Sequence, residues 1–322
     1  MADLSVGGQA VIEGVMMRST DKVATAVRMG DGKILVKTQD YISLSKRHKL
    51  LNVPILRGAV VFVEMLVLGI KTLNFSADVA IREQEKQDAA ANDKAYHEKP
   101  GKSNALMLGL TALFALAFGI FVFFFIPLAI SSFFNVDKNA VWFNLAAGGI
   151  RLTMFLAYVW VISLFGEFRR IFQYHGAEHK SIYAYEMGDE LTPERAATHT
   201  RLHPRCGTSF IIIVALIAII VYAFSDTMYA MHTGHPPTLL ARFAVHFSLL
   251  PFVAGGSYEL LKLSGKTRDN KLTRLLIKPG LWLQLITTKE PSREQLEVGI
   301  VALEAALGLT ESKIVAQKVA AS

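Results

Sequence analysis

The sequence contains a single cysteine, Cys206, among its 322 residues. One thiol cannot form a disulfide within the chain, so the disulfide framework of small secreted proteins is excluded. No Gly-x-x-x-x-Gly-Lys-Ser/Thr phosphate loop occurs either, which argues against ATP-driven transport. The N-terminal residues include Asp3 and Glu13 and lack the basic–apolar–small order of a signal peptide, so we expect no cleaved leader.

Charged residues are absent from two long stretches of the chain, 104–130 and 206–224. Crossing a hydrocarbon core of roughly 30 Å takes about 20 helical residues, and both stretches are long enough. Helices of this length that are apolar on every face are rare in soluble proteins. The sequence therefore predicts an α-helical integral membrane protein. Its four expected transmembrane helices are Asn104–Ile130, Val141–Phe165, Cys206–Ala230 and Leu239–Leu263.

The positions of the basic residues predict how these helices are oriented. The short connections 131–140 and 231–238 contain one lysine between them, whereas the loop 166–205 contains six Lys and Arg residues. Because basic loops stay on the inner side, we place this loop and both termini in the cytoplasm, with the helices in the plasma membrane. The net charge of +7 then reflects contact with the lipid bilayer, and no nucleic-acid partner is expected.

The segment 53–75, "VPILRGAVVFVEMLVLGIKTLNF", is apolar but carries charged residues. If it crossed the membrane, the basic residues of 1–52 would lie outside the cell. We therefore predict a re-entrant or interfacial helix that returns to the cytoplasmic side. Its Arg57 and Glu64 side chains would face protein or water.

The chain divides into seven parts on these grounds. They are a β-containing element (1–52), a re-entrant or interfacial helix (53–75), a polar helix and linker (76–103), a transmembrane hairpin (104–165), a cytoplasmic histidine-rich loop (166–205), a second hairpin (206–263) and a cytoplasmic tail (264–322). Within the first part, Gly30-Asp31-Gly32 between two strand-like runs predicts a β-hairpin. Within the last, Ser292 is a helix-cap signal before an amphipathic helix.

The stretch "FQYHGAEHKSIY" contains the residues of greatest chemical interest. In a helix, His175 and His179 lie one turn apart on the same face, with Glu178 beside them. The order His-x-x-Glu-His is that of inverted zinc peptidases, in which the imidazoles bind zinc and the glutamate acts as general base. So short a pattern also occurs by chance among solvent-exposed polar residues at the end of a transmembrane helix.

A second cluster, "HTRLHPRCG", supplies two more imidazoles and the thiol. His203 and Cys206 would come from a turn, because the proline between them ends a helix. Thiolate with imidazole suits zinc, although other first-row metals remain open. The alternative is that Cys206 is a small buried apolar residue and His199 a solvated loop residue. Glu259, near the end of the last transmembrane helix, is a further candidate ligand.

Other polar residues lie near the same membrane depth. The glycine-rich run "GGQAVIEGVMMR" holds Glu13 and Arg18, and Arg205 precedes the thiol. Glycine here indicates special backbone angles or close approach to another element. Arg151 falls within an expected transmembrane helix, where it needs a partner such as a carboxylate or a carbonyl.

Five motifs together resemble one family. They are "GGQAVIEGVMMRS", "YHGAEHKSIYAYE", "RLHPRCGTSF", "AGGSYELLKL" and "PGLWLQLITTKEP". They are similar to the YqhQ-like bacterial integral membrane family, which is of unknown function and often labelled metal-dependent enzyme. The resemblance extends from Gly7 to about Leu307. It implies a polar signature at Glu13, Arg18, His175, Glu178, His179, His203, Arg205, Cys206 and Glu259.

Two functions remain open on the sequence. The first is a non-catalytic membrane factor that assembles, stabilises or regulates another membrane complex, such as protein-export or insertion machinery. The alternative is a membrane-embedded zinc-dependent hydrolase, with Glu178 as base. Its zinc (Zn2+) would be held by His175, His179 and one of His203, Cys206 or Glu259. A secondary transporter would show paired inverted halves, and the sequence shows none.

Overall fold

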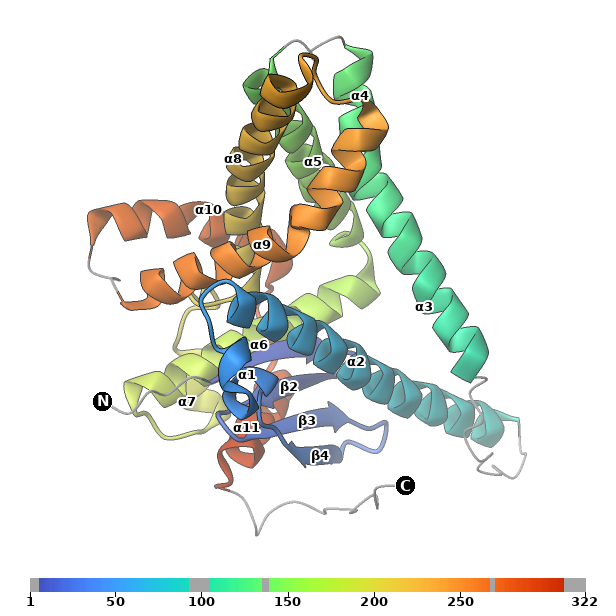
Figure 1. Cartoon of the computed structure of the whole chain (residues 1–322). Helices are drawn as coiled ribbons and strands as arrows, with labels where there is room; N and C mark the ends of the chain where they lie inside the picture. Colours follow the sequence, from blue (N-terminus) through green and yellow to red (C-terminus); the bar gives the residue numbers. More distant parts are fainter. Residues whose placement is uncertain (1–5, 93–104, 135–138, 267–269, 310–322) are drawn as a thin grey trace.

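The computed structural model describes residues 6–92, 105–134, 139–266 and 270–309. Long apolar helices form a bundle, and a small sheet with its own helices lies beneath it (Figure 1). The predicted linker at 93–103 lies outside the described residues.

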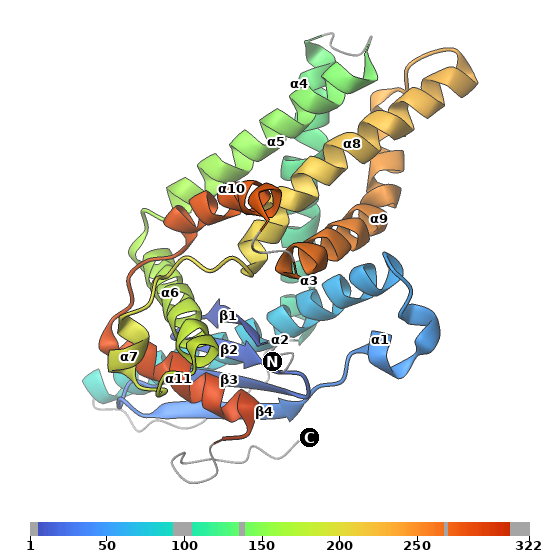
Figure 2. The ribbon, with the colours of Figure 1, turned by 90° about the vertical axis from the view of Figure 1, so that its left-hand side faces the viewer.

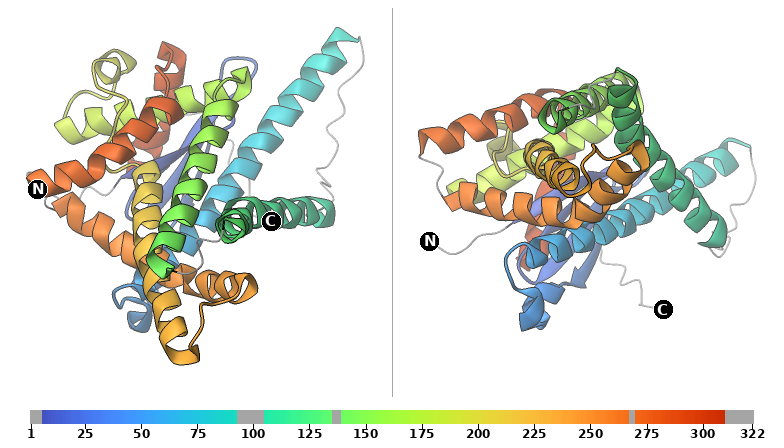
Figure 3. Two further views of the ribbon diagram at one scale, coloured as in Figure 1. Left: turned by 90° about the horizontal axis from the view of Figure 1, so that it is seen from above. Right: turned by 45° about the horizontal axis from the view of Figure 1, so that its top comes forward.

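Four helical segments are long and apolar enough to cross a membrane, as the sequence predicts. They are Leu113–Phe133, Ala140–Ile162, Phe210–Thr233 and Leu239–Leu263. The first combines the second half of α3 (Ala105–Ile120), a π-helical turn η2 (Phe121–Phe125) and α4 (Ile126–Phe133). The others lie in α5 (Ala140–Ile162), α8 (Gly207–Thr233) and α9 (Leu239–Lys266). Seen from above, α3 diverges from the remaining bundle (Figure 3).

The N-terminal sheet is an antiparallel meander in the order β1-β2-β3-β4. Its strands are β1 (Gly7–Val11), β2 (Gly14–Arg18), β3 (Lys22–Arg28) and β4 (Ile34–Asp40). The predicted hairpin is confirmed between β3 and β4, where Gly32 adopts a φ of 84°. Strands β1 and β2 were not predicted, because their glycines weaken the usual strand signal.

Both faces of this sheet are covered, which places the core in two layers. On one face, Val15 and Met17 pack against α6 (Gly166–Met187) and α11 (Arg293–Leu307). On the other face, Met16 and Val27 pack against α2 (Leu56–Ala91). Successive strand residues point to opposite faces, so alternate positions of one strand enter different cores.

Helix α2 is one unbroken helix of 36 residues, and it is not among the four candidate transmembrane segments. It lies between α9 and the sheet (Figure 1). Gly58 of α2 faces Gly255 of α9, where a Cβ on Gly58 would lie 2.7 Å from the Gly255 carbonyl oxygen. This close crossing is joined by a bidentate ion pair between Arg57 and Glu259. Of the two predicted environments of Arg57, protein or water, the structure has the side chain against α9.

The remaining helices link the bundle to the sheet. Helix α10 (Lys271–Thr287) packs against α8 and α5 (Figure 2). The short elements are α1 (Leu44–Arg47), η1 (Lys49–Leu51) and α7 (Pro193–Ala197). The predicted cap at Ser292 begins α11, and its reciprocal partner is Gln295. A Cβ on Gly299 would lie 2.7 Å from the Ser181 hydroxyl, so glycine lets α11 approach α6 closely.

A buried polar network joins three helices of the bundle. Asp226 of α8 accepts from Arg242 Nε (3.1 Å) and His246 Nε2 (2.9 Å), both on α9. Asn144 of α5 donates to the same carboxylate at 2.9 Å. Arg151, for which the sequence predicts a partner, donates from Nε to the Phe123 carbonyl of η2 at 3.0 Å. The pairing of Asp226 with Arg242 and His246 was not predicted from the sequence.

Candidate metal centre

Helix α6 carries the His-x-x-Glu-His motif. It begins after a turn that follows α5 and ends at Gly188, which adopts a left-handed φ of 76°. One side of the helix packs on the sheet through Tyr174 and Ile182. His179 and Glu178 are almost fully buried, because this part of the helix is enclosed by the sheet and by segments from the bundle.

Three ligand-type side chains converge beside α6. His175, His179 and Cys206 each offer one ligand atom, and these atoms all lie within 4.8 Å of one another. The His175 Nε2 atom is 3.2 Å from Cys206 Sγ. Cys206 is the N-cap of α8, and its sulfur also accepts from the Thr208 amide and hydroxyl. The group therefore joins α6 to the first turn of a transmembrane helix.

Backbone carbonyls fix the orientation of both histidine rings. His175 Nδ1 lies 2.8 Å from the Thr287 carbonyl, and His179 Nδ1 lies 2.5 Å from the Arg201 carbonyl. A carbonyl only accepts, so each Nδ1 carries the hydrogen and each Nε2 is left with a lone pair. His179 Nε2 is buried and has no hydrogen-bond partner among the described residues. Metal-binding histidines in proteins are usually held in this way.

The protonation states also suit metal binding. Burial alone would raise the pKa of the Cys206 thiol, but the neighbouring His179 imidazole and the hydrogen bonds from Thr208 hold that pKa below its usual value. Burial lowers the pKa of His179, which keeps its imidazole neutral. Thiolate and neutral imidazole are the forms that coordinate a metal.

Glu178 lies next to the three ligands without being one of them. Its side chain is 5% exposed, and burial raises its pKa to about 8. The Gly8 amide hydrogen-bonds to the carboxylate, while Oε2 is buried and has no partner in the described part of the chain. A Cβ on Gly8 would lie 2.9 Å from Glu178 Cδ, so the glycine provides the space for this carboxylate. Proton transfer at Oε2 is chemically accessible near neutral pH.

His203 is a neighbour of this group. Its ring centroid is 5.7 Å from that of His179, and its Nε2 lies 3.4 Å from a Glu186 carboxylate oxygen. Glu186 also forms an ion pair with Arg205. The Gln284 side chain hydrogen-bonds to both the His203 amide and carbonyl at 2.8 Å. The structure thus places His203 outside the three-ligand group. Glu186 and Gln284, which fix it there, carry no sequence signal of their own.

The other predicted site residues lie elsewhere. Glu259 is paired with Arg57 at the α2–α9 crossing, away from the histidines. Glu13 is bound to Arg170 of α6. His199 contacts Asp189 at 2.7 Å.

Two further polar residues help to join α2 to the sheet layer. Arg18 donates to Met65 Sδ at 3.0 Å and lies over the Tyr41 ring. Glu64 accepts from the Tyr41 and Ser43 hydroxyls. These contacts connect elements rather than complete the ligand set.

Two residues that look unfavourable beside a metal-binding motif have structural reasons. A Cβ on Gly176 would lie 2.1 Å from the Lys289 carbonyl oxygen, so glycine allows the segment after α10 to cross α6. Lys180 is 3% exposed and donates to the Ala197 carbonyl and to Glu290. Its charge is directed away from the histidines by these partners.

Comparison with known proteins agrees with the resemblance seen in the motifs. Residues 53–309 match the family described as "Protein of unknown function (DUF1385)". The chain is 34% identical over 310 residues to "Uncharacterized protein YqhQ" of Bacillus subtilis (strain 168), covering 94% of this chain and 92% of the relative. No solved structure matches the chain. The histidine–cysteine group lies within the region that matches the family. The protein, which is similar to YqhQ, therefore belongs to the DUF1385 family.

Proposed function

We propose that the protein is a multi-pass factor of the bacterial inner membrane, with both termini cytoplasmic, that holds a zinc ion through His175, His179 and Cys206. Its role is non-catalytic: it assembles, stabilises or regulates another membrane complex. One observation carries the metal assignment. The three ligand atoms lie within 4.8 Å of one another while carbonyls hold both histidine Nδ1 atoms.

Zinc suits these donors better than a hard cation does. Thiolate and imidazole are typical zinc ligands, with Zn–N of about 2.0 Å and Zn–S of about 2.3 Å. Those lengths imply ligand-to-ligand separations of about 3.3 to 3.6 Å in a tetrahedral site. The 3.2 Å between His175 Nε2 and Cys206 Sγ is close to this range, and the longer separations, all within 4.8 Å, would have to shorten as the side chains close on the ion.

The position of the ligands supports a structural or regulatory role. Two ligands come from α6, which packs on the sheet, and the third caps transmembrane helix α8. An ion bound to all three would fasten the sheet to the bundle. Helix α2 lies beside this junction with exposed Val63, Leu66 and Ile70, and we place this apolar face at the inner membrane interface.

A hydrolase remains a second candidate because of Glu178. Its buried Oε2 lacks a partner among the described residues, and the carboxyl pKa of about 8 suits proton transfer. A bound zinc ion would supply Lewis acidity and activate water. In that case Glu178 would accept a proton at Oε2, and the Gly8 amide would hold the carboxylate in place.

Metal analysis of the full chain purified in detergent under zinc-replete conditions tests the site. We expect about one zinc per wild-type chain, with loss in His179→Ala and in Cys206→Ser. The matched control is His199→Ala, which removes an imidazole that contacts Asp189 and not the ligands. Zinc-free wild-type protein would contradict the assignment.

Glu178→Gln separates the two roles. Under the non-catalytic role, the variant retains zinc and still complements a deletion strain. Retained zinc with lost complementation would favour the hydrolase. For the non-catalytic role, affinity purification from native membranes should also recover a stoichiometric membrane partner, and repeated recovery of the chain alone would contradict it.

A further inference from the structure

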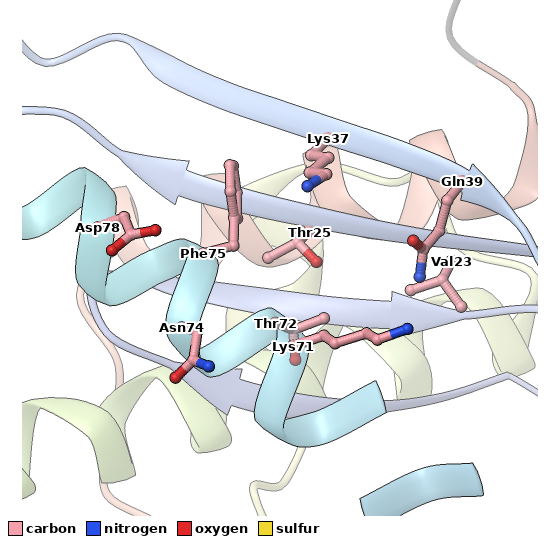
Figure 4. A pocket seen from close by; sticks show the side chains of 9 residues that line it. All are labelled: Val23, Thr25, Lys37, Gln39, Lys71, Thr72, Asn74, Phe75 and Asp78. Carbon is pink, nitrogen blue, oxygen red and sulfur yellow. The ribbon is translucent and has the colours of Figure 1, made fainter. Parts of the chain in front are cut away.

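A pocket of about 310 Å³ lies between α2 and the sheet, distinct from the metal centre. Figure 4 shows residues of β3, β4 and α2 around it. Much of the layer between α2 and the sheet is apolar, with Val23 and Val27 of β3 packed beside Leu68 and Val79 of α2. The pocket interrupts this apolar layer with polar side chains. They are Thr25, Lys37, Gln39, Lys71, Thr72, Asn74 and Asp78.

Thr25 is a polar residue of the pocket wall whose side chain faces the inside of the pocket. It lies between Val23 and Val27 on the same face of β3, the face that packs on α2. An apolar residue is expected at such a position. The residue is only 3% exposed, and its hydroxyl points into the space between sheet and helix (Figure 4). The structure describes no hydrogen bond from this hydroxyl to another described residue. The hydroxyl is therefore available to form a hydrogen bond with a molecule in the pocket.

Two lysines, one from each wall, give the pocket its charge. Lys37 projects from β4 and Lys71 from α2, and both ammonium groups face the space between the walls (Figure 4). No carboxylate within ion-pair distance of either lysine is found in the described ranges. Asp78 lies at the opposite end from Lys71, beyond Phe75 (Figure 4). The lysine end is therefore suited to an anion and the Asp78 end to a hydrogen-bond donor.

We infer that this pocket binds a phosphate-bearing small molecule, with the phosphate between Lys37 and Lys71 and within reach of the Thr25 hydroxyl. Ammonium and hydroxyl groups are common phosphate ligands, and two lysines from facing walls match a doubly charged group better than a carboxylate. The volume is at the lower end for small-molecule sites. Phosphate of this kind is carried either by a soluble phosphorylated compound or by a lipid headgroup. Helix α2 lies between the sheet and α9 (Figure 1). The lining residues Lys37, Gln39 and Lys71 are exposed, so a soluble compound can also reach them.

The test uses the full chain in phosphatidylcholine nanodiscs, with the variants Lys37→Gln/Lys71→Gln and Lys33→Gln. Lys33 is the matched control because it lies on the same hairpin, is paired with Asp31 and does not line the pocket. Titration calorimetry with inorganic pyrophosphate tests the soluble source. Nanodiscs that contain phosphatidylglycerol, followed by native mass spectrometry of retained lipid, test the headgroup source.

We expect wild type and Lys33→Gln to bind at least one probe equally. The double variant should bind that probe about thirtyfold more weakly, because each lysine near a membrane surface contributes about a factor of five. If the double variant binds pyrophosphate more weakly than wild type does, the ligand is a soluble phosphorylated compound. If instead it retains less phosphatidylglycerol, the ligand is a lipid headgroup. Equal binding by all three proteins, or no binding of either probe to wild type, would overturn the inference. Thr25→Val provides a second, uncharged variant that should also weaken binding while leaving both lysines in place.

Discussion

The backbone of Gly8 touches the side chain of Glu178, and this contact determines whether the carboxylate fits beside the histidines. A Cβ on Gly8 would lie 2.6 Å from the Met16 carbonyl oxygen and 2.9 Å from Glu178. The Met16 carbonyl belongs to the neighbouring strand and cannot move freely. Position 8 therefore constrains both the sheet and the site.

Gly8→Ala should lower the free energy of unfolding by about 1–3 kcal/mol, as overpacking usually does. The measurement is thermal or denaturant unfolding of the detergent-solubilised protein. Gly7→Ala is the matched control, because a Cβ on Gly7 meets no atom within 4 Å. Equal stability of the two variants would show that β1 can move away from α6.

Residues of the site differ in how far the sequence alone could identify them. The spacing of His175 and His179 is local, so helical periodicity was enough to place both on one face. Cys206 joins them through packing of α6 on the start of α8, which spacing along the chain does not predict. Glu259 is excluded from the group by Arg57, a partner 202 positions away.

At the scale of elements, the bundle is held by the carboxylate of Asp226. This group contacts residues on both neighbouring helices, and Arg242 and His246 are fully buried with it. Inside a membrane such groups are costly unless paired. Each residue looks like an isolated polar position in an apolar run, and only the packing of α5, α8 and α9 shows that they belong together.

Asp226→Leu should destabilise the bundle by about 3–5 kcal/mol, because the Arg242 charge would then be buried without its carboxylate. The double variant Asp226→Leu/Arg242→Met should recover part of that loss, since neither charge remains. Unfolding of the purified proteins in one detergent gives the comparison. A double variant as unstable as the sum of the two single variants would contradict the pairing.

Secondary-structure elements were predicted well where one local signal dominates. The apolar runs gave the transmembrane helices, and the fourth was predicted with the bounds Leu239–Leu263 found in the structure. Ser292 gave the start of α11. Strands β1 and β2 were missed because glycines at positions 7, 8 and 14 weaken the strand pattern. Two of them, Gly8 and Gly14, allow close contacts with other elements.

For the whole molecule, the proposed metal centre lies where sheet and bundle meet. If zinc is bound there as we propose, its removal should affect global stability as well as local order. A chelator should lower the unfolding temperature of the wild type and leave that of Cys206→Ser unchanged. An equal decrease in both proteins would mean that the chelator acts elsewhere or that the ligands differ from those named.

The orientation of the molecule in the membrane also has a direct test. A Cys206→Ser background carrying Asp3→Cys should resist labelling by an impermeant thiol reagent in intact cells and react after lysis. The reason is that the positive-inside rule keeps the N-terminal region on the inner side. Labelling in intact cells would reverse the assignment of the N-terminus and of α2.

The carbonyl that orients His175 belongs to Thr287, the final residue of α10. The next residues continue across α6, where the Lys289 amide donates to the Phe172 carbonyl at 2.8 Å. A shift of α10 along α8 would therefore pull directly on the imidazole and loosen its hold on an ion. The zinc affinity would then depend on the position of α10. A partner protein that displaces this helix would change the metal occupancy without contacting any ligand.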